Sequence, residues 1–177
     1  MIRWRRGQVR SLLPSWSGVH VCAVDLAADS DTAPPSTCRA LAYTDLVGEP
    51  RVGDEVLLNT GALDLGLGTG GYALVVAVPD RLPADREGPG HLVKARYTPL
   101  QVTVQGADEQ GSPHHETLRA ARGIDGMPVV VADLHSSLPA VLAGVRAERP
   151  RTRVVNVVLD GGALPAMFSR SLGALRE

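Results

Sequence analysis

The chain has 177 residues, a 44% hydrophobic share and a formal net charge of −1. This length allows one ordinary domain or two small ones with a buried core. The near-zero charge and the 3% aromatic content argue against a nucleic-acid partner, because phosphates attract basic surfaces and bases stack on aromatic rings. No apolar run approaches the ~20 residues that cross a bilayer, and no secretory signal follows the charged amino terminus. We therefore expect a cytoplasmic protein with no membrane-spanning segment.

The first half of the chain predicts a small antiparallel β-barrel. Short runs rich in β-branched residues alternate with clusters of Gly, Pro, Asp and Ser, which is the pattern of strands joined by turns. Val19, Val21 and Ala23 alternate along one run, which predicts a sheet with one side packed inward and the other facing water. The expected strands are Gly7–Leu13, Val19–Leu26, Thr37–Tyr43, Glu55–Asn59 and Gly71–Val78.

Two features of this half resemble functional motifs, and both have a structural explanation. Gly66, Gly68 and Gly71 match the G-x-G-x-x-G spacing of dinucleotide folds, but that motif must open a helix, and here a strand-like run follows. A glycine-rich turn is the favoured interpretation, and a loop lining a cleft is the alternative. Cys22 and Cys38 could face each other across two strands, yet a reducing cytoplasm favours two buried thiols over a disulfide.

The second half predicts a different architecture. A polar, proline-rich stretch at residues 80–90 has no periodicity and is typical of a linker between a barrel domain at 1–79 and a second domain at 91–177. The valine-rich runs of the second domain are apolar on both faces, as parallel strands covered by helices are. The fold class is therefore α+β in two parts, with a barrel followed by a three-stranded parallel α/β unit, a Rossmann-like half. Its expected elements are an extended run near Leu100–Gln105, a helix near Pro113–Ala121, a strand Pro128–Ala132, a helix Ser137–Glu148, a strand Arg153–Leu159 and a helix Leu164–Leu175.

Candidate functional residues follow the two valine-rich strands. Ligands of open parallel sheets bind beyond the carboxyl ends of the strands, where helix amino termini point free amides into the crevice. The ligand-binding candidates are Asp133, His135, Ser136, Asp160, Gly161 and Gly162. The carboxylates could accept hydrogen bonds from a sugar hydroxyl, or they could coordinate a divalent metal. The metal-ligating candidates are Asp133, His135, Asp160, His114 and His115.

Each candidate also has a purely structural interpretation. Ser136 or Ser137 before Pro139 is typical of a capped helix start, and Asp160 before two glycines is typical of a turn. His114 and His115 lie in the first turn after Pro113, where no ligand is needed to explain them. No serine lies in a G-x-S-x-G motif, so no catalytic residue is assigned.

Several long motifs in this order resemble a known family. They are the segments 64–72 (DLGLGTGGY), 91–99 (HLVKARYTP), 112–116 (SPHHE) and 133–136 (DLHS). The chain resembles the uncharacterised bacterial family named domain of unknown function 3866. The resemblance implies no activity, but it implies that this chain corresponds to the amino-terminal half of a typical member. A three-stranded parallel sheet would then be incomplete and would leave an edge open, so we expect either a truncated product or self-association through that edge.

Three functions remain open on the sequence. The first is a small-molecule-binding or enzymatic α/β module with its site at the strand ends. The second is a non-enzymatic protein-interaction or assembly module, in which the candidate residues only begin helices. The third is a metal-dependent hydrolase, and the sequence does not identify a cofactor beyond allowing a divalent metal.

Overall fold

The computed structural model describes residues 2–28, 36–67, 70–85, 88–158 and 166–175. The chain divides into two compact units. The first combines Met1–Pro83 with Ala132–Glu177, and the second is Ala84–Val131. The first change of unit falls inside the predicted linker, but residues 132–177 group with the barrel.

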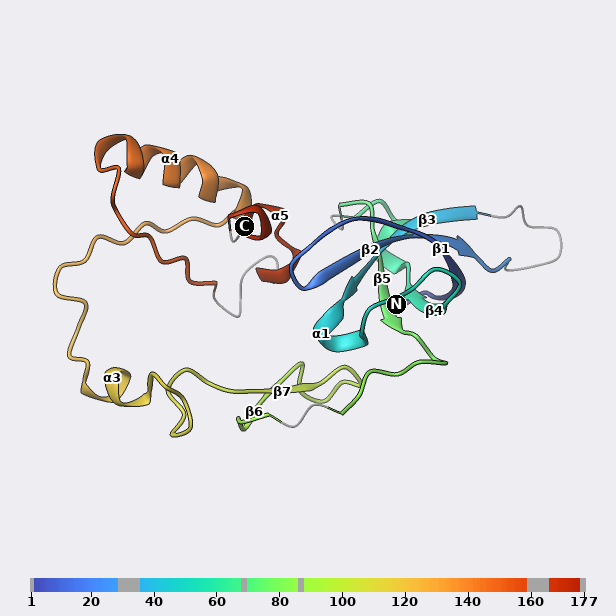
Figure 1. Cartoon of the computed structure of the whole chain (residues 1–177), viewed down its shortest axis with the longest axis horizontal. Coiled ribbons are helices and arrows are strands. Elements are labelled where there is room, and N and C mark those ends of the chain that lie inside the picture. Colours follow the sequence, from blue (N-terminus) through green and yellow to red (C-terminus); the bar gives the residue numbers. More distant parts are fainter. Residues whose placement is uncertain (1, 29–35, 68–69, 86–87, 159–165, 176–177) are drawn as a thin grey trace. The chain divides into compact units, whose positions relative to one another are not determined.

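The first unit is built on a closed five-stranded barrel in the order β1-β2-β3-β5-β4 (Figure 1). All its neighbouring strands are antiparallel except β3 and β5, which pair in parallel through Ala40–Ala73 and Leu41–Leu74. This is a five-stranded Greek-key arrangement, and closing it removes the unpaired edges that an open sheet presents. The predicted barrel is confirmed, with strands β1 (Trp4–Trp16), β2 (Val19–Leu26), β3 (Ser36–Tyr43), β4 (Glu55–Asn59) and β5 (Ala73–Ala77).

Strand β1 closes the barrel because it pairs with two partners. Its first residues pair with β4, and from Gly7 onward it pairs with β2. Two register irregularities, between Val9 and Ser11 and between Leu13 and Trp16, increase the local twist that a small barrel needs. Gly7 lies so close to β2 that a Cβ atom there would be 2.6 Å from Val24 Cγ1 and 2.8 Å from the Asp25 carbonyl oxygen.

The barrel interior is filled by small and β-branched side chains. Val9, Cys22, Val24, Ala40, Ala42, Val56, Leu58, Ala73 and Val75 form this core, which Val47 and Val78 extend. Val47 belongs to α1 (Thr44–Val47), a single turn that follows β3, and α2 (Gly61–Asp64) is a similar turn that follows β4. Both cysteines are free thiols, as predicted, with Cys22 buried and Cys38 half-buried.

Four short helical elements lie in the described residues of the carboxyl-terminal part of the first unit. They are the 3₁₀ turns η1 (His135–Ser137) and η2 (Ala166–Phe168) and the helices α4 (Leu138–Glu148) and α5 (Arg170–Ala174). The predicted helix at 137–148 is confirmed, and its apolar stripe of Leu138, Val141, Leu142 and Val145 is its less exposed side, but none of these residues is fully buried. The helix expected from Leu164 to Leu175 is interrupted, because Ser169 adopts an extended conformation (φ −79°, ψ 107°) and starts α5 anew by accepting a hydrogen bond from Leu172 N. Its first residues lie outside the described part of the chain.

The second unit is small and mostly exposed. An antiparallel pair, β6 (Leu92–Lys94) and β7 (Val102–Val104), is followed by α3 (His115–Ala120). The expected extended run and helix are therefore confirmed, whereas β6 was not predicted. Gly90, with φ of +122°, precedes the pair at a point where a Cβ atom would lie 2.5 Å from Gln105 N.

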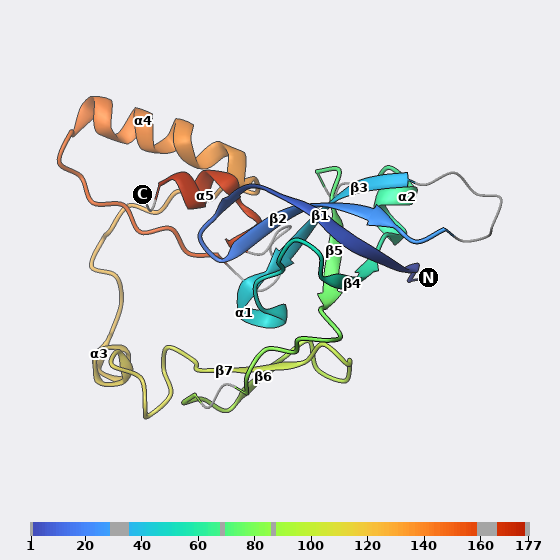
Figure 2. The ribbon, with the colours of Figure 1, turned by 45° about the vertical axis from the view of Figure 1, so that its right-hand side comes forward.

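The structure corrects the prediction of a parallel sheet. Residues 128–132 and 153–158 form no strand, and the described residues contain no parallel α/β unit, although Leu159 itself lies outside the described range. The two valine-rich runs appear in Figures 1 and 2 as ribbons without arrows, flanking α4 in sequence. β-branched composition favours an extended backbone, but a strand also needs a neighbour that accepts its hydrogen bonds, and no described segment pairs with these two runs. Among the described helices, none is long and apolar enough to cross a membrane.

Candidate functional site

The candidate residues after the first valine run lie at the start of α4. Asp133 and Ser136 are exposed and His135 is half-buried in η1. Pro139 occupies the first turn of α4, as predicted, but the Ser137 side chain makes no capping hydrogen bond. Asp160, Gly161 and Gly162 lie outside the described residues. The two predicted strand ends are therefore not brought together by any described sheet, and their shared role stays a prediction.

Two of the three histidines proposed as metal ligands, His114 and His115, lie in the second unit, where their contacts are local. His115 Nδ1 lies 2.7 Å from the Asp108 carbonyl oxygen, and His115 Nε2 lies 3.8 Å from Glu116 Oε1. The His114 backbone amide donates to Ser112 Oγ at 3.1 Å, and Ser112 is buried. These contacts are those of a structured turn entering α3. Across the described ranges, no group of three or more His, Cys, Asp or Glu side chains lies close enough to hold a metal ion.

A second apolar cluster lies on the outside of the barrel. Val19, Val21 and Leu41 are fully buried although they point away from the interior, because side chains alternate between the two faces of a strand. They are covered by Leu13, Trp16, Tyr43, Tyr72, Leu74, Met167 and Phe168. Four of the six aromatic residues of the whole chain belong to this outer cluster.

The outer cluster corrects the expectation that one side of β2 faces water. Along β2 both alternating sets are apolar, with Cys22 and Val24 inside and Val19 and Val21 outside. A strand that is apolar on both faces needs a cover on each. The apolar character of both faces can be seen in the sequence of β2. The residues that pack on the outer face cannot, because Met167 lies 151 positions away from Trp16.

Trp16 holds the carboxyl-terminal segment against this face. Its indole N–H donates to the Met167 carbonyl oxygen at 2.8 Å, and the Arg170 guanidinium lies 5.8 Å from the indole centroid. Gly173 is buried against the same ring, so that a Cβ atom there would lie 3.1 Å from Trp16 Cβ. Trp16 therefore contacts the segment on both sides of Ser169.

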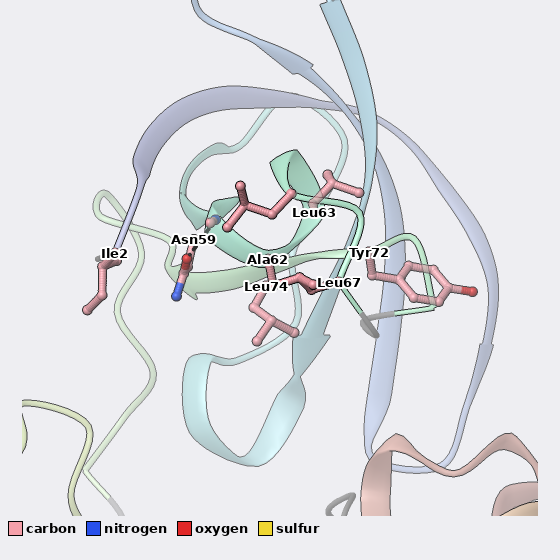
Figure 3. A pocket seen from close by; sticks show the side chains of 9 residues that line it. Ile2, Asn59, Ala62, Leu63, Leu67, Tyr72 and Leu74 are labelled. Carbon is pink, nitrogen blue, oxygen red and sulfur yellow. Dashed lines mark hydrogen bonds between the residues drawn. The ribbon is translucent and has the colours of Figure 1, made fainter.

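Beside this cluster lies an open apolar groove of about 300 Å³ (Figure 3). Figure 3 shows Ala62 and Leu74 together at its centre, with Ile2 and Asn59 toward one end and Tyr72 toward the other. Gly61, Leu63, Leu65 and Leu67 complete the lining. Gly66 and Gly71 of the glycine-rich stretch have positive φ values of 65° and 79° and lead into β5, which supports the turn interpretation, while Leu67 and Tyr72 line the groove.

One comparison with known proteins gives a match. The chain belongs to the family described as Protein of unknown function (DUF3866). The family model matches residues 39–177, so the match begins within β3, leaves β1 and β2 outside and covers the whole of the second unit. The resemblance to domain of unknown function 3866 is thereby confirmed. No curated protein and no solved structure matches the chain.

Proposed function

We propose that this DUF3866 chain is a non-enzymatic assembly module that self-associates through its two valine-rich runs and α4. The observation that carries the proposal is the exposure of the runs, since Val131 is 93% and Val155 is 84% exposed. Burying a valine side chain contributes roughly 1.5–3 kcal/mol, and monomeric proteins seldom leave contiguous apolar segments in water.

The backbone of the two runs supports the same conclusion. Residues 128–132 and 153–158 make no backbone hydrogen bond to any described residue. Unpaired amides and carbonyls on β-branched segments are a template for pairing with another strand. A partner strand would satisfy the hydrogen bonds and bury the valines in one step.

Charge and symmetry favour a second copy as the partner. Asp125 and Asp133 flank the first run, whereas Arg149 and Arg151 precede the second, which begins at Arg153. In a twofold dimer that pairs the first run of each copy with the second run of the other, this attraction between acidic and basic flanks occurs twice. The net charge of −1 opposes such association very little.

Sedimentation velocity over a range of concentrations tests the proposal. We expect the wild-type chain to form a dimer or larger species, and Val130→Asp and Val155→Asp to shift it toward the monomer, because a buried unpaired carboxylate is costly. Val52→Asp is the matched control, since Val52 and Val130 are both 63% exposed and Val52 lies in a barrel loop. A wild-type chain that stays monomeric at every concentration would overturn the proposal.

The small-molecule and metal-dependent hypotheses depend on the same association. Asp133, His135, Ser136 and the residues 160–162 would share one edge only if the runs became neighbouring strands. Metal analysis of the wild-type chain and of Asp133→Ala tests this separately. A stoichiometric metal that is lost in the variant would favour a metal-dependent function over simple assembly.

A further inference from the structure

The outer face of the barrel already holds one polypeptide segment. Met167 and Phe168 pack on Val19, Val21 and Leu41, which are fully buried beneath the cover. This contact is separate from the valine-rich runs, and it is closely packed, because a Cβ atom at Gly173 would lie only 3.1 Å from the Trp16 side chain.

The hydrogen bond from Trp16 recognises backbone. The indole N–H donates to the carbonyl oxygen of Met167, at 2.8 Å, and not to a side chain. Any polypeptide presents such a carbonyl, so this donor does not require the sequence of residues 166–174. The remaining contacts of the segment with the face are apolar packing and the Arg170 guanidinium near the indole.

The open groove is the uncovered continuation of the same face. Tyr72 and Leu74 belong both to the outer cluster under Met167 and Phe168 and to the lining of the groove. Leu65 and Leu67 leave more than half of their surface exposed at its rim. The covered and uncovered parts therefore form one continuous apolar band.

We propose that this band is a docking site for a polypeptide segment with large apolar side chains, and that residues 166–174 are its in-chain occupant over one part. The groove is the part of the band that residues 166–174 leave uncovered. Among the described residues, its lining is aliphatic except for Asn59 and Tyr72, and the guanidinium of Arg39 is stacked on the Tyr72 ring at 4.7 Å. Barrels that bind oligonucleotides combine aromatic platforms with a positively charged groove, so the lining favours a polypeptide over a nucleic acid.

The in-chain segment sets the conditions under which a partner binds. A tethered occupant competes intramolecularly, at an effective concentration that its linker sets. A partner that uses the whole band must displace Met167 and Phe168, so weakening their contacts should strengthen partner binding.

The probe is a synthetic peptide with the sequence of residues 165–175, added to the isotope-labelled full chain and followed by NMR. We expect saturable shifts at the amides of Leu67, Tyr72 and Leu74. Phe168→Ala should tighten binding by about tenfold, and Leu67→Asp should weaken it by at least about tenfold. Leu46→Asp is the matched control, because Leu46 is an exposed leucine on α1 outside the groove.

Several results would overturn the proposal. One is the absence of saturable shifts in both the wild type and Phe168→Ala, and another is unchanged binding by Leu67→Asp. If an oligothymidylate shifts these amides and the peptide does not, the face binds nucleic acid instead. Should Phe168→Ala fail to fold, Gly173→Leu displaces the segment from Trp16 by steric contact, and the comparison of wild type with Leu67→Asp still decides. A negative result leaves the tests on Val130 and Val155 unaffected.

Discussion

At the scale of single residues, one ion pair joins the segment that leaves β5 to the turn that precedes β4. It is formed by Arg81 and Asp54. The Asp54 carboxylate accepts a hydrogen bond from the Arg51 amide at 2.8 Å and another from the Arg81 guanidinium. Arg81 also donates to the Glu49 carbonyl oxygen at 2.8 Å. Burial by itself would raise the pKa of Asp54, but the hydrogen bonds and the positive charges of Arg51 and Arg81 outweigh it and hold the pKa below its usual value.

We predict that Arg81→Met lowers the free energy of unfolding by about 1 kcal/mol near neutral pH, since the pair is charged but partly exposed. The folded-state pKa of Asp54 lies below the unfolded one, so its contribution is present above the unfolded pKa and is lost as the pH falls through the folded pKa. Urea unfolding at neutral and acid pH should show the variant and the wild type converging in acid. Arg119→Met, which removes an exposed pair with Glu116, should change little at either pH. An equal loss at both pH values for Arg81→Met would contradict this role.

The two cysteines give a second prediction at this scale. Burial, reinforced by the charge of Asp54, raises the pKa of Cys22 to about 11, and burial with the charge of Asp64 does the same for Cys38. Because the thiolate is the reactive form, we expect both thiols to react slowly with an aromatic disulfide reagent at neutral pH and rapidly after unfolding. Comparison of Cys22→Ser with Cys38→Ser should show the half-buried Cys38 reacting first. Fast labelling of both thiols in the folded chain would refute the burial argument.

At the scale of elements, sequence patterns correctly predicted those strand and helix bounds that depend on neighbouring residues in the chain. The bounds of β2 and β4 were predicted to the residue, because flanking turn residues fix the ends of a strand, but the prediction that one face of β2 meets water was wrong. Helix α4 was predicted within one residue from its i, i+3, i+4 stripe and Pro139. The strands predicted at 128–132 and 153–158 were wrong because strand formation also depends on a neighbouring strand, and no local pattern encodes that neighbour.

The candidate site also has a part that could be predicted from local sequence and a part that depends on tertiary contacts. That Asp133 and His135 lead into a helix was readable from the sequence, whereas their convergence with another strand end depends on a sheet that the described residues do not form. The outer cluster was missed because Trp16 and Met167 are joined only by tertiary contact. Because both faces of β2 are apolar, each face needs other residues packed on it, but the sequence pattern does not say which residues these are.

Helix α4 provides a prediction about its own stability. It has 11 residues, no side-chain cap and no fully buried residue, and isolated helices of fewer than ~12–15 residues are marginal in water. Hydrogen exchange should therefore be fast in α4 of the monomeric chain and slow in β2 and β3, whose amides are paired inside the barrel. At concentrations where the chain self-associates, protection of α4 should rise. Strong protection in the monomer would show that the helix is stabilised without a partner.

At the scale of the whole molecule, the division into two units predicts that a destabilising substitution in one unit lowers the stability of that unit alone. Gly7 and Gly90 are both required by close backbone approach, one in each unit. Alanine at position 7 would press on Val24 and Asp25 inside the barrel. Alanine at position 90 would press on Gln105 and would also hold a φ of +122°, which L residues rarely adopt.

We expect Gly7→Ala to destabilise the barrel by about 1–3 kcal/mol, as forced contacts in packed regions do, and to leave the second unit unchanged. Gly90→Ala should have the reverse effect, because the contacts it strains join residues of the second unit alone. Hydrogen exchange resolved to single amides separates the two, with Val21 and Leu41 reporting on the barrel and the β6–β7 pair on the second unit. Gly123→Ala, where a Cβ atom meets nothing within 4 Å, is the control and should alter neither unit. If Gly90→Ala loosened the barrel amides as much as the β6–β7 pair, the two units would unfold as one cooperative structure, because only coupled unfolding carries a local strain across a unit boundary.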